Sequence, residues 1–172
     1  QTAFGYDAAN RLTSVLSPTS QRWTYEYDRN GNRTKLVDAN GNATSGDPND
    51  GTSSYGYDVL NRVTSTDYAD ATPDVTFGYD ENGNRTSLTD GWGTQSATYD
   101  ALDRLTAVTR GTDSFSYVYD PAGNVTQRTY PGGRIATYTY DDDGRLATVA
   151  SNGLTTSYGY DGNANLTAST DP

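Results

Sequence analysis

The stretch Tyr119-Asp120-Pro121-Ala122-Gly123-Asn124-Val125-Thr126 decides the fold, because the chain repeats its frame from one end to the other. Each copy has Tyr-Asp, two variable residues, a residue typical of turns, and then Arg or Asn. The eight copies begin at Tyr6, Tyr27, Tyr57, Tyr79, Tyr99, Tyr119, Tyr140 and Tyr160. Successive copies start 21, 30, 22, 20, 20, 21 and 20 residues apart. Such a period indicates a repeat architecture.

The Tyr-Asp frame predicts the turn of a β-hairpin. Asp is favoured at the first position of a type I turn, where its carboxylate accepts a hydrogen bond from the backbone two residues on. These residues are Asp7, Asp28, Asp58, Asp80, Asp100, Asp120, Asp141 and Asp161. A left-handed bulge residue closes such a turn, and the chain places there Gly31, Gly83, Gly123, Gly144, Asn10, Asn61, Asp103 and Ala164. We expect the Ala164 turn to be the most strained or the least ordered, because alanine disfavours this conformation.

This turn geometry also predicts the pairing across each hairpin. The Asp lies opposite the residue after the bulge, and the Tyr lies opposite the next residue. The residue after the bulge alternates strictly between Arg and Asn, which defines Arg-type turns (Arg11, Arg62, Arg104 and Arg145) and Asn-type turns (Asn32, Asn84, Asn124 and Asn165). Two Asn-type turns place Tyr27 opposite Arg33 and Tyr79 opposite Arg85, a pairing that allows a cation–π contact. The alternation indicates a structural unit of two repeats.

Aromatic and β-branched residues alternate with small or polar ones on the approach to each turn. Trp23, Tyr25 and Tyr27 alternate with Thr24 and Glu26, for example. A period of two with these residue types predicts a half-buried strand. The fold class is therefore all-β, with tandem β-hairpin repeats in an extended, twisted antiparallel sheet that resembles a β-solenoid or a shell wall.

The composition excludes several classes of function. The chain of 172 residues has a net charge of −10, and it contains neither Cys nor His. It therefore lacks thiol nucleophiles, disulfides and the commonest general base and zinc ligand. An acidic chain disfavours nucleic acid, and no apolar run approaches the length of about 18 residues that a membrane span needs. We expect no enzyme and no cofactor.

The repeats predict one array over residues 1–172, with one long insertion at 38–51 that is rich in Gly, Asn and Asp. Gln1 is not an initiator Met, and both ends fall in phase with the repeat, so we expect a fragment of a longer repeat protein. The end strands of such an array expose unpaired edges. Further repeats of the same protein or other copies of the chain are the partners that these edges predict.

The recurring Tyr-Asp-x-x-Gly-Asn/Arg-x-Thr frame resembles the RHS/YD repeat of bacterial secreted and surface proteins, which toxin-complex shell components and the animal teneurins share. The resemblance covers nearly the whole chain. It implies a long β-sheet that spirals into a hollow shell, which encloses a toxic domain or supports adhesion at a cell surface. It also implies an extracellular location in a bacterium.

Two patterns outside the repeat frame are candidate binding sites. Asp38 and Asn40, with Asp47 and Asp50, resemble the start of a calcium loop, although the spacing of an EF-hand is absent and turn chemistry is the simpler interpretation. Trp92 lies between two glycines in a turn, where it would stack on a glycan; packing on the neighbouring hairpin is the alternative that we favour.

The leading hypothesis is a non-enzymatic structural segment that forms the wall of a hollow shell around cargo such as a toxin. One alternative is a filament in which copies of the chain join through their open edges. Another is an adhesin or carbohydrate-binding module that uses Trp92 and the insertion.

Overall fold

A computed structural model describes residues 1–41 and 51–170. These residues form sixteen strands and one short 3-10 helix, η1 (Pro131–Gly133). The strands are β1 (Ala3–Tyr6), β2 (Leu12–Leu16), β3 (Arg22–Tyr27), β4 (Arg33–Val37), β5 (Thr52–Tyr57), β6 (Val63–Tyr68), β7 (Val75–Tyr79), β8 (Arg85–Asp90), β9 (Gly93–Tyr99), β10 (Leu105–Arg110), β11 (Asp113–Tyr119), β12 (Val125–Thr129), β13 (Ile135–Tyr140), β14 (Leu146–Ser151), β15 (Leu154–Tyr160) and β16 (Leu166–Thr170). The all-β fold class predicted from the repeats is confirmed.

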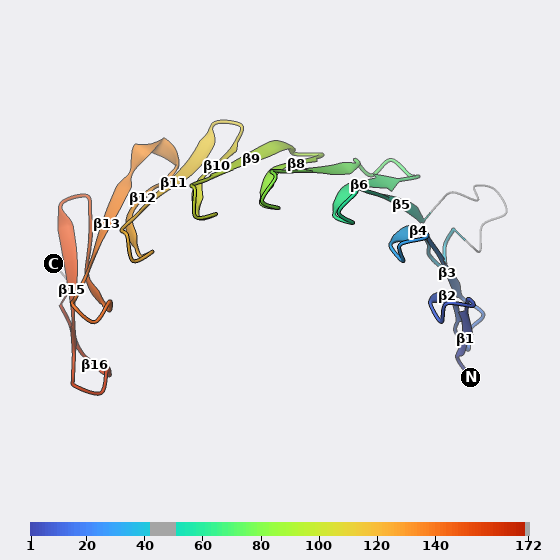
Figure 1. Cartoon of the computed structure of the whole chain (residues 1–172), viewed down its shortest axis with the longest axis horizontal. Coiled ribbons are helices and arrows are strands. Elements are labelled where there is room, and N and C mark those ends of the chain that lie inside the picture. Colours follow the sequence, from blue (N-terminus) through green and yellow to red (C-terminus); the bar gives the residue numbers. More distant parts are fainter. Residues whose placement is uncertain (42–50, 171–172) are drawn as a thin grey trace. The chain divides into compact units, whose positions relative to one another are not determined.

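The chain divides into two compact units, Gln1–Asp80 with Ser87–Thr94, and Glu81–Thr86 with Gln95–Pro172. In the first unit, β1 to β7 pair antiparallel, each with its neighbours along the chain. The same holds for β9 to β16 in the second unit. Each unit is therefore a run of hairpins that lie side by side in chain order (Figure 1).

The register at the turns agrees with the pairing that the sequence predicts. In the first unit Tyr6 pairs with Leu12, and Tyr27 pairs with Arg33. In the second unit Tyr99 pairs with Leu105. Tyr57, Tyr119, Tyr140 and Tyr160 pair in the same way with Val63, Val125, Leu146 and Leu166. In each case the register shifts by one residue just before the Tyr, as a turn that ends in a bulge requires.

The bulge residues adopt the left-handed backbone that the turn needs. Gly31 has φ 92°, Asn10 has φ 64° and Asp103 has φ 60°. Ala164 adopts the same conformation, with φ 65°, although alanine has no compensating side-chain hydrogen bond. The last turn still forms, because Ala164 N–H donates to the Asp161 carbonyl at 3.0 Å.

The sheet is one layer thick, and this explains why its side chains are mostly half-buried. Among the described residues, Ala136 is the one buried apolar residue. Side chains alternate between the two faces along each strand. One face carries the aromatic residues, and the other is rich in Ser, Thr and Gly, with cross-strand hydroxyl pairs such as Thr98 with Thr106 at 2.9 Å and Thr139 with Thr148 at 2.6 Å.

Candidate functional site

The Tyr-Asp turns join β1 to β2, β3 to β4 and each later pair of strands. Within each unit they therefore lie in a row at one end of the strands, and we name this row the turn edge. The aspartate of each turn holds its loop closed. In the first turn, Asp7 Oδ1 accepts the backbone N–H groups of Ala9 and Arg11, both at 2.9 Å. Asp7 Oδ2 accepts Arg11 Nε at 2.7 Å.

The same bonds recur along the turn edge. The second oxygen of the aspartate accepts a hydrogen bond from the guanidinium in Arg-type turns and from the side-chain amide in Asn-type turns. Asp58 with Arg62 and Asp28 with Asn32 are examples. Further examples are Asp100 with Arg104, Asp120 with Asn124, Asp141 with Arg145 and Asp161 with Asn165. Arg145 also pairs with Asp143 at 2.9 Å.

These hydrogen bonds lower the pKa of the turn aspartates, because they stabilise the ionised carboxylate. For Asp7, Asp58 and Asp141 the largest cause is the backbone N–H of the following Arg. For Asp100 it is the Arg104 side chain. For Asp28, Asp120 and Asp161 it is the amide of the following Asn. The carboxylates are therefore used to hold the turns, which does not suit them to act as general acids.

Each Arg-type turn also binds the next turn along the chain. Arg11 Nη1 donates to the Asp28 carbonyl at 2.7 Å, and its guanidinium lies 4.9 Å from the centre of the Tyr27 ring. The same two contacts link Arg62 to Asp80 and Tyr79, Arg104 to Asp120 and Tyr119, and Arg145 to Asp161 and Tyr160. A two-repeat unit is thus visible, in which an Arg-type hairpin binds the following Asn-type hairpin.

The cation–π contact that the pairing of Tyr27 with Arg33 allows does not form. Tyr27 and Arg33 are cross-strand partners, but Arg11 from the preceding hairpin occupies the Tyr27 ring. Arg33 instead lies 4.8 Å from the ring centre of Tyr55 on the following hairpin. The spacing of residues in a turn predicts the strand register within one hairpin. It does not show that a side chain of the neighbouring hairpin covers the tyrosine ring.

Two Asn-type turns also bind the following Arg-type turn through their asparagine side chains. Asn30 and Asn32 both donate to Asn61 Oδ1, at 2.9 and 2.7 Å. In the second unit, Asn82 and Asn84 both donate to Asp103 Oδ1, at 2.8 and 2.6 Å. The sequence analysis assigned Asn61 and Asp103 only to the bulge conformation and missed this role. A signal was present, since Asn or Asp bulges occur only in Arg-type turns.

The tyrosine hydroxyls provide the link that recurs most regularly. Tyr27 Oη donates to the Leu12 carbonyl of the preceding hairpin at 2.8 Å, and Tyr57 Oη donates to the Arg33 carbonyl at 2.9 Å. The same bond joins Tyr79 to Val63, Tyr99 to Arg85, Tyr119 to Leu105, Tyr140 to Val125 and Tyr160 to Leu146. The acceptor always lies two residues after a bulge. We name these bonds the tyrosine ladder.

A second cluster of rings and cations lies on β11, β12 and the connection to β13. Arg128 lies 5.3 Å from the centre of the Tyr117 ring, and Arg134 lies 4.2 Å from that of Tyr130. A hydrogen bond with Tyr138 is the largest cause that lowers the pKa of Tyr130, and burial raises that of Tyr138. The cluster packs neighbouring strands together on the aromatic face.

The two candidate binding sites are placed as follows. Trp92 is 88% exposed, so the favoured interpretation that it packs on a neighbouring hairpin is wrong. Its glycan contact stays a prediction. Asp38 Oδ1 accepts the N–H groups of Asn40 and Gly41 in a turn, at 2.8 and 3.1 Å. Asp47 and Asp50 lie outside the described residues, so the calcium site stays a prediction as well.

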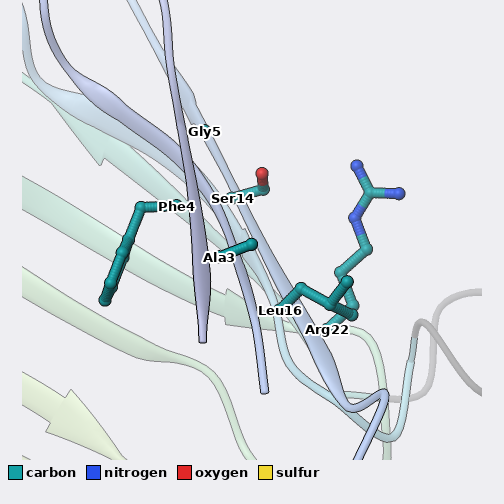
Figure 2. A pocket seen from close by; sticks show the side chains of 6 residues that line it. All are labelled: Ala3, Phe4, Gly5, Ser14, Leu16 and Arg22. Atoms are coloured by element: carbon teal, nitrogen blue, oxygen red, sulfur yellow. The ribbon is translucent and has the colours of Figure 1, made fainter. Parts of the chain in front are cut away.

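A shallow hollow of about 260 Å³ lies beside β1 and is lined by Ala3, Phe4, Gly5, Ser14, Leu16 and Arg22. Phe4 points away from the side on which Ser14, Leu16 and Arg22 lie (Figure 2). The lining offers one cation and no carboxylate, and it therefore provides no acid–base pair. Residues 1–41 and 51–170 contain no group of three acidic side chains arranged to hold a metal, and no helix in them is suited to cross a membrane.

The stacked hairpins and their turn-to-turn bonds define a structural repeat protein. Two family models match the chain: RHS Repeat over residues 6–43 and Teneurin YD-shell over residues 42–171. The second match covers more than half of the chain, and the chain therefore belongs to the Teneurin YD-shell family. The resemblance to RHS/YD repeats is confirmed. No curated protein matches the sequence.

Solved structures show the same fold. The crystal structure of TcdB2-TccC3-Cdc42 matches with a TM-score of 0.58 and 15% identity, over 99% of this chain and 11% of that one. A mutant Tc holotoxin pore of Photorhabdus luminescens matches with a TM-score of 0.57 and 16% identity, again over 99% and 11%. The chain thus spans about a ninth of the length of these structures.

Proposed function

We propose that this chain is a segment of the wall of a hollow extracellular shell made by a bacterium, and that the shell encloses cargo such as a toxin. Its role in this proposal is architectural and non-enzymatic. Membership of the YD-shell family and the likeness to TcdB2-TccC3 structures support it. The segment supplies hairpins, and the hairpins before and after it in the complete wall supply the neighbours that its end strands lack.

The tyrosine ladder is the observation that carries this proposal. Each described ladder bond joins a hairpin to the one before it, as Tyr119 Oη does with the Leu105 carbonyl at 2.7 Å. The turn aspartates likewise form hydrogen bonds within their own turns, and the arginines of the Arg-type turns donate to the next turn, as Arg104 does. Each hairpin added to such an array forms the same hydrogen bonds with the hairpin before it and so adds stability, as in other repeat proteins. A wall of any length follows from the same contacts.

The test is electron microscopy of the chain together with the residues that flank it in its own protein, followed by protease digestion of the intact particles. A wall around a lumen, with the enclosed residues resistant to protease until the particle is opened by acid, is the expected result. Solid or thread-like particles without a lumen, fully open to protease, would disprove the shell.

The exposure of Trp92 favours a second function, binding of glycans at the turn between β8 and β9. An exposed aromatic side chain offers a flat face on which a sugar ring can stack. The backbone N–H of Trp92 donates to Asp90 Oδ1 at 2.9 Å, which fixes the turn that carries the ring. A glycan array tests this function. Binding that Trp92→Ala abolishes, with unchanged circular dichroism, supports it, and an array without binding excludes it.

A further inference from the structure

We propose that Arg128, Arg134 and the Tyr130 hydroxyl form a binding site for a phosphoryl group, a tetrahedral oxyanion that carries two negative charges. The site lies on three neighbouring strands of the second unit, β11, β12 and β13, and on the turn that joins β12 to β13. It does not depend on the proposed wall, because two adjacent hairpins contain all of its residues.

Arg128 breaks the repeat at a position that is otherwise uncharged. The eighth residue after the turn aspartate in the other seven repeats is Val15, Leu36, Thr66, Leu88, Val108, Val149 or Ser169. In the repeat of Asp120 it is Arg128, which pairs across the hairpin with Tyr117. The packing of repeats therefore does not require an arginine here. Departures from a local rule of this kind are expected at functional or strained sites.

Two guanidinium groups share the Tyr130 ring. Arg134 lies 4.2 Å from the ring centre, and Arg128 lies 5.8 Å from it. Arg128 also lies 5.3 Å from the centre of the Tyr117 ring. Opposite Arg128 on β13 stands Ala136, which offers no polar side-chain atom. Stacking on aromatic rings holds a guanidinium in place while its N–H groups, which point outward in its plane, can still bind an oxyanion.

No carboxylate neutralises these two cations within the part of the chain that the structure describes. The arginines that pair there with an aspartate of their own turn are Arg11, Arg62, Arg104 and Arg145. Neither Arg128 nor Arg134 has such a partner. Arg128 Nε is moreover buried, and none of the described residues accepts its hydrogen. A buried donor without an acceptor is costly, so an anion that reaches the Arg128 guanidinium is favoured.

The Tyr130 hydroxyl supplies a third donor. Hydrogen bonds with Tyr138 and Arg128 lower the pKa of Tyr130, because both stabilise its ionised oxygen. The charges of Arg128 and Arg134 act in the same direction. Burial raises the pKa of Tyr138, so Tyr138 keeps its hydrogen and donates it to Tyr130. The Tyr130 oxygen thus accepts from both neighbours, which leaves its own hydrogen to bind a ligand.

Three donors and two positive charges match a phosphoryl group better than a carboxylate. A phosphate monoester has three terminal oxygens and a charge of about −1.5 to −2 at pH 7, so Arg128, Arg134 and Tyr130 each find an acceptor. A carboxylate has two oxygens and one charge, which leaves one cation unmatched. Phe115 lies edge-on to Tyr130 at 5.9 Å and is 36% exposed, so it offers an apolar surface to an organic group attached to the phosphate.

An NMR titration of the chain with inorganic phosphate, at about pH 7 and constant ionic strength, tests the proposal. We expect the Nε–H signals of Arg128 and Arg134 to shift and saturate together. Arg134→Gln and Arg128→Gln should each raise the dissociation constant about tenfold, and Tyr130→Phe, which keeps the ring, about two- to fivefold. The same spectra show whether each variant is folded. Arg134 is exposed, so Arg134→Gln decides the matter if Arg128→Gln unfolds the chain.

A matched variant and two further ligands make the test specific. Arg33 lies 4.8 Å from the centre of the Tyr55 ring on other hairpins, so Arg33→Gln removes a stacked guanidinium elsewhere and should leave the dissociation constant unchanged. Acetate at equal ionic strength should bind at least about tenfold more weakly than phosphate. Tighter binding of phenyl phosphate, with shifts of the Phe115 ring, would identify an organic phosphate as the ligand, and equal affinity would identify free phosphate.

Three results would overturn the phosphoryl site. These are shifts that grow linearly without saturation, equal affinities for acetate and phosphate, and a dissociation constant that Arg134→Gln leaves unchanged. Each of them would leave the proposed wall intact, because stacking of the hairpins does not use Arg134. Particles without a lumen would disprove the wall and leave this site intact.

Discussion

The junction between the second and third turns and the junction between the sixth and seventh turns differ in one set of bonds. In the first junction Asn30 and Asn32 donate to Asn61. In the second, the corresponding positions hold Ala122, Asn124 and Gly144, so both a donor and the acceptor side chain are missing. Both junctions keep the ladder bond, from Tyr57 to Arg33 at 2.9 Å and from Tyr140 to Val125 at 2.8 Å.

The comparison ranks the contacts along the turn edge. The aspartate bonds and the tyrosine ladder occur at both junctions, so stacking depends on them. The hydrogen bonds from Asn30 and Asn32 to Asn61, here named the amide bridge, occur at only one of the two junctions, so stacking does not require them. Loss of an aspartate bond or a ladder bond should therefore destabilise both junctions to the same extent. Loss of the amide bridge should destabilise only the junction that has it.

Acid should have the largest effect, because it acts on many turn aspartates at once. The folded pKa values of Asp7, Asp28, Asp58, Asp100, Asp120, Asp141 and Asp161 lie below their ordinary value of 3.8. Their contribution to stability is therefore complete above pH 3.8 and is lost as the pH falls through the lowered values. Urea unfolding at a series of pH values should give a constant free energy from pH 7 to pH 5 and a steep decline below pH 3.8.

Asp58→Asn is the matched variant for the acid experiment. It removes one ionisable carboxylate, keeps the shape of the side chain, and should reduce the slope of the free energy of unfolding against pH below pH 3.8. A free energy of unfolding that stays constant from pH 7 to pH 2 would contradict the role assigned to the aspartates.

Loss of a ladder tyrosine should have the next largest effect. Tyr57→Ala and Tyr140→Ala each remove a half-buried ring, and each should lower the free energy of unfolding by about 2 kcal/mol, less than the cost of a fully buried ring. Tyr57→Phe and Tyr140→Phe should each cost about 1 kcal/mol, because the carbonyl acceptor loses its donor. Chemical denaturation measures both changes.

Tyr6→Phe is the control for the tyrosine series. The Tyr6 hydroxyl has no acceptor among the described residues, so its loss should change the free energy of unfolding by less than about 0.5 kcal/mol when measured on dilute protein. Unequal effects at Tyr57 and Tyr140 would show that the amide bridge changes how much the ladder contributes.

A side chain at the bulge of the sixth turn should have a smaller effect. Gly123 has φ 96°, so Gly123→Val should cost about 1–2 kcal/mol through backbone strain. Ala122→Val, one residue earlier, should change the free energy of unfolding by less than about 0.5 kcal/mol. Thermal and urea unfolding of the two variants compare them directly, and equal effects would mean that the bulge lies elsewhere.

Much of this hierarchy follows from the sequence. The hairpin, its bulge and the pairing of Tyr57 with Val63 depend on local turn chemistry, and local chemistry is visible in one repeat. The contacts between hairpins depend on which side chains of two distant repeats meet. Arg11 lies over Tyr27, sixteen residues away, and no turn rule within one repeat specifies that contact. The strict alternation of Arg and Asn indicated a two-repeat unit without showing its bonds.

The smallest effect should come from building the missing bridge into the junction between the sixth and seventh turns. Gly144 has φ 75°, and a Cβ there would meet no atom within 4 Å, so Gly144→Asn fits the backbone as Asn61 does in the third turn. Ala122→Asn then restores the second donor beside Asn124. Alone, Ala122→Asn should have no effect, because its acceptor is absent.

Together the two substitutions should raise the free energy of unfolding by about 0.5–1.5 kcal/mol more than the sum of their separate effects, the usual range for one new hydrogen bond. A double-mutant cycle measured by urea unfolding gives this coupling directly. Effects that simply add would mean that the bond between Asn30 and Asn61 accompanies stacking without stabilising it. A positive coupling would mean that the bridge can be transferred between junctions because the ladder already holds the turns at the distance that the bridge needs.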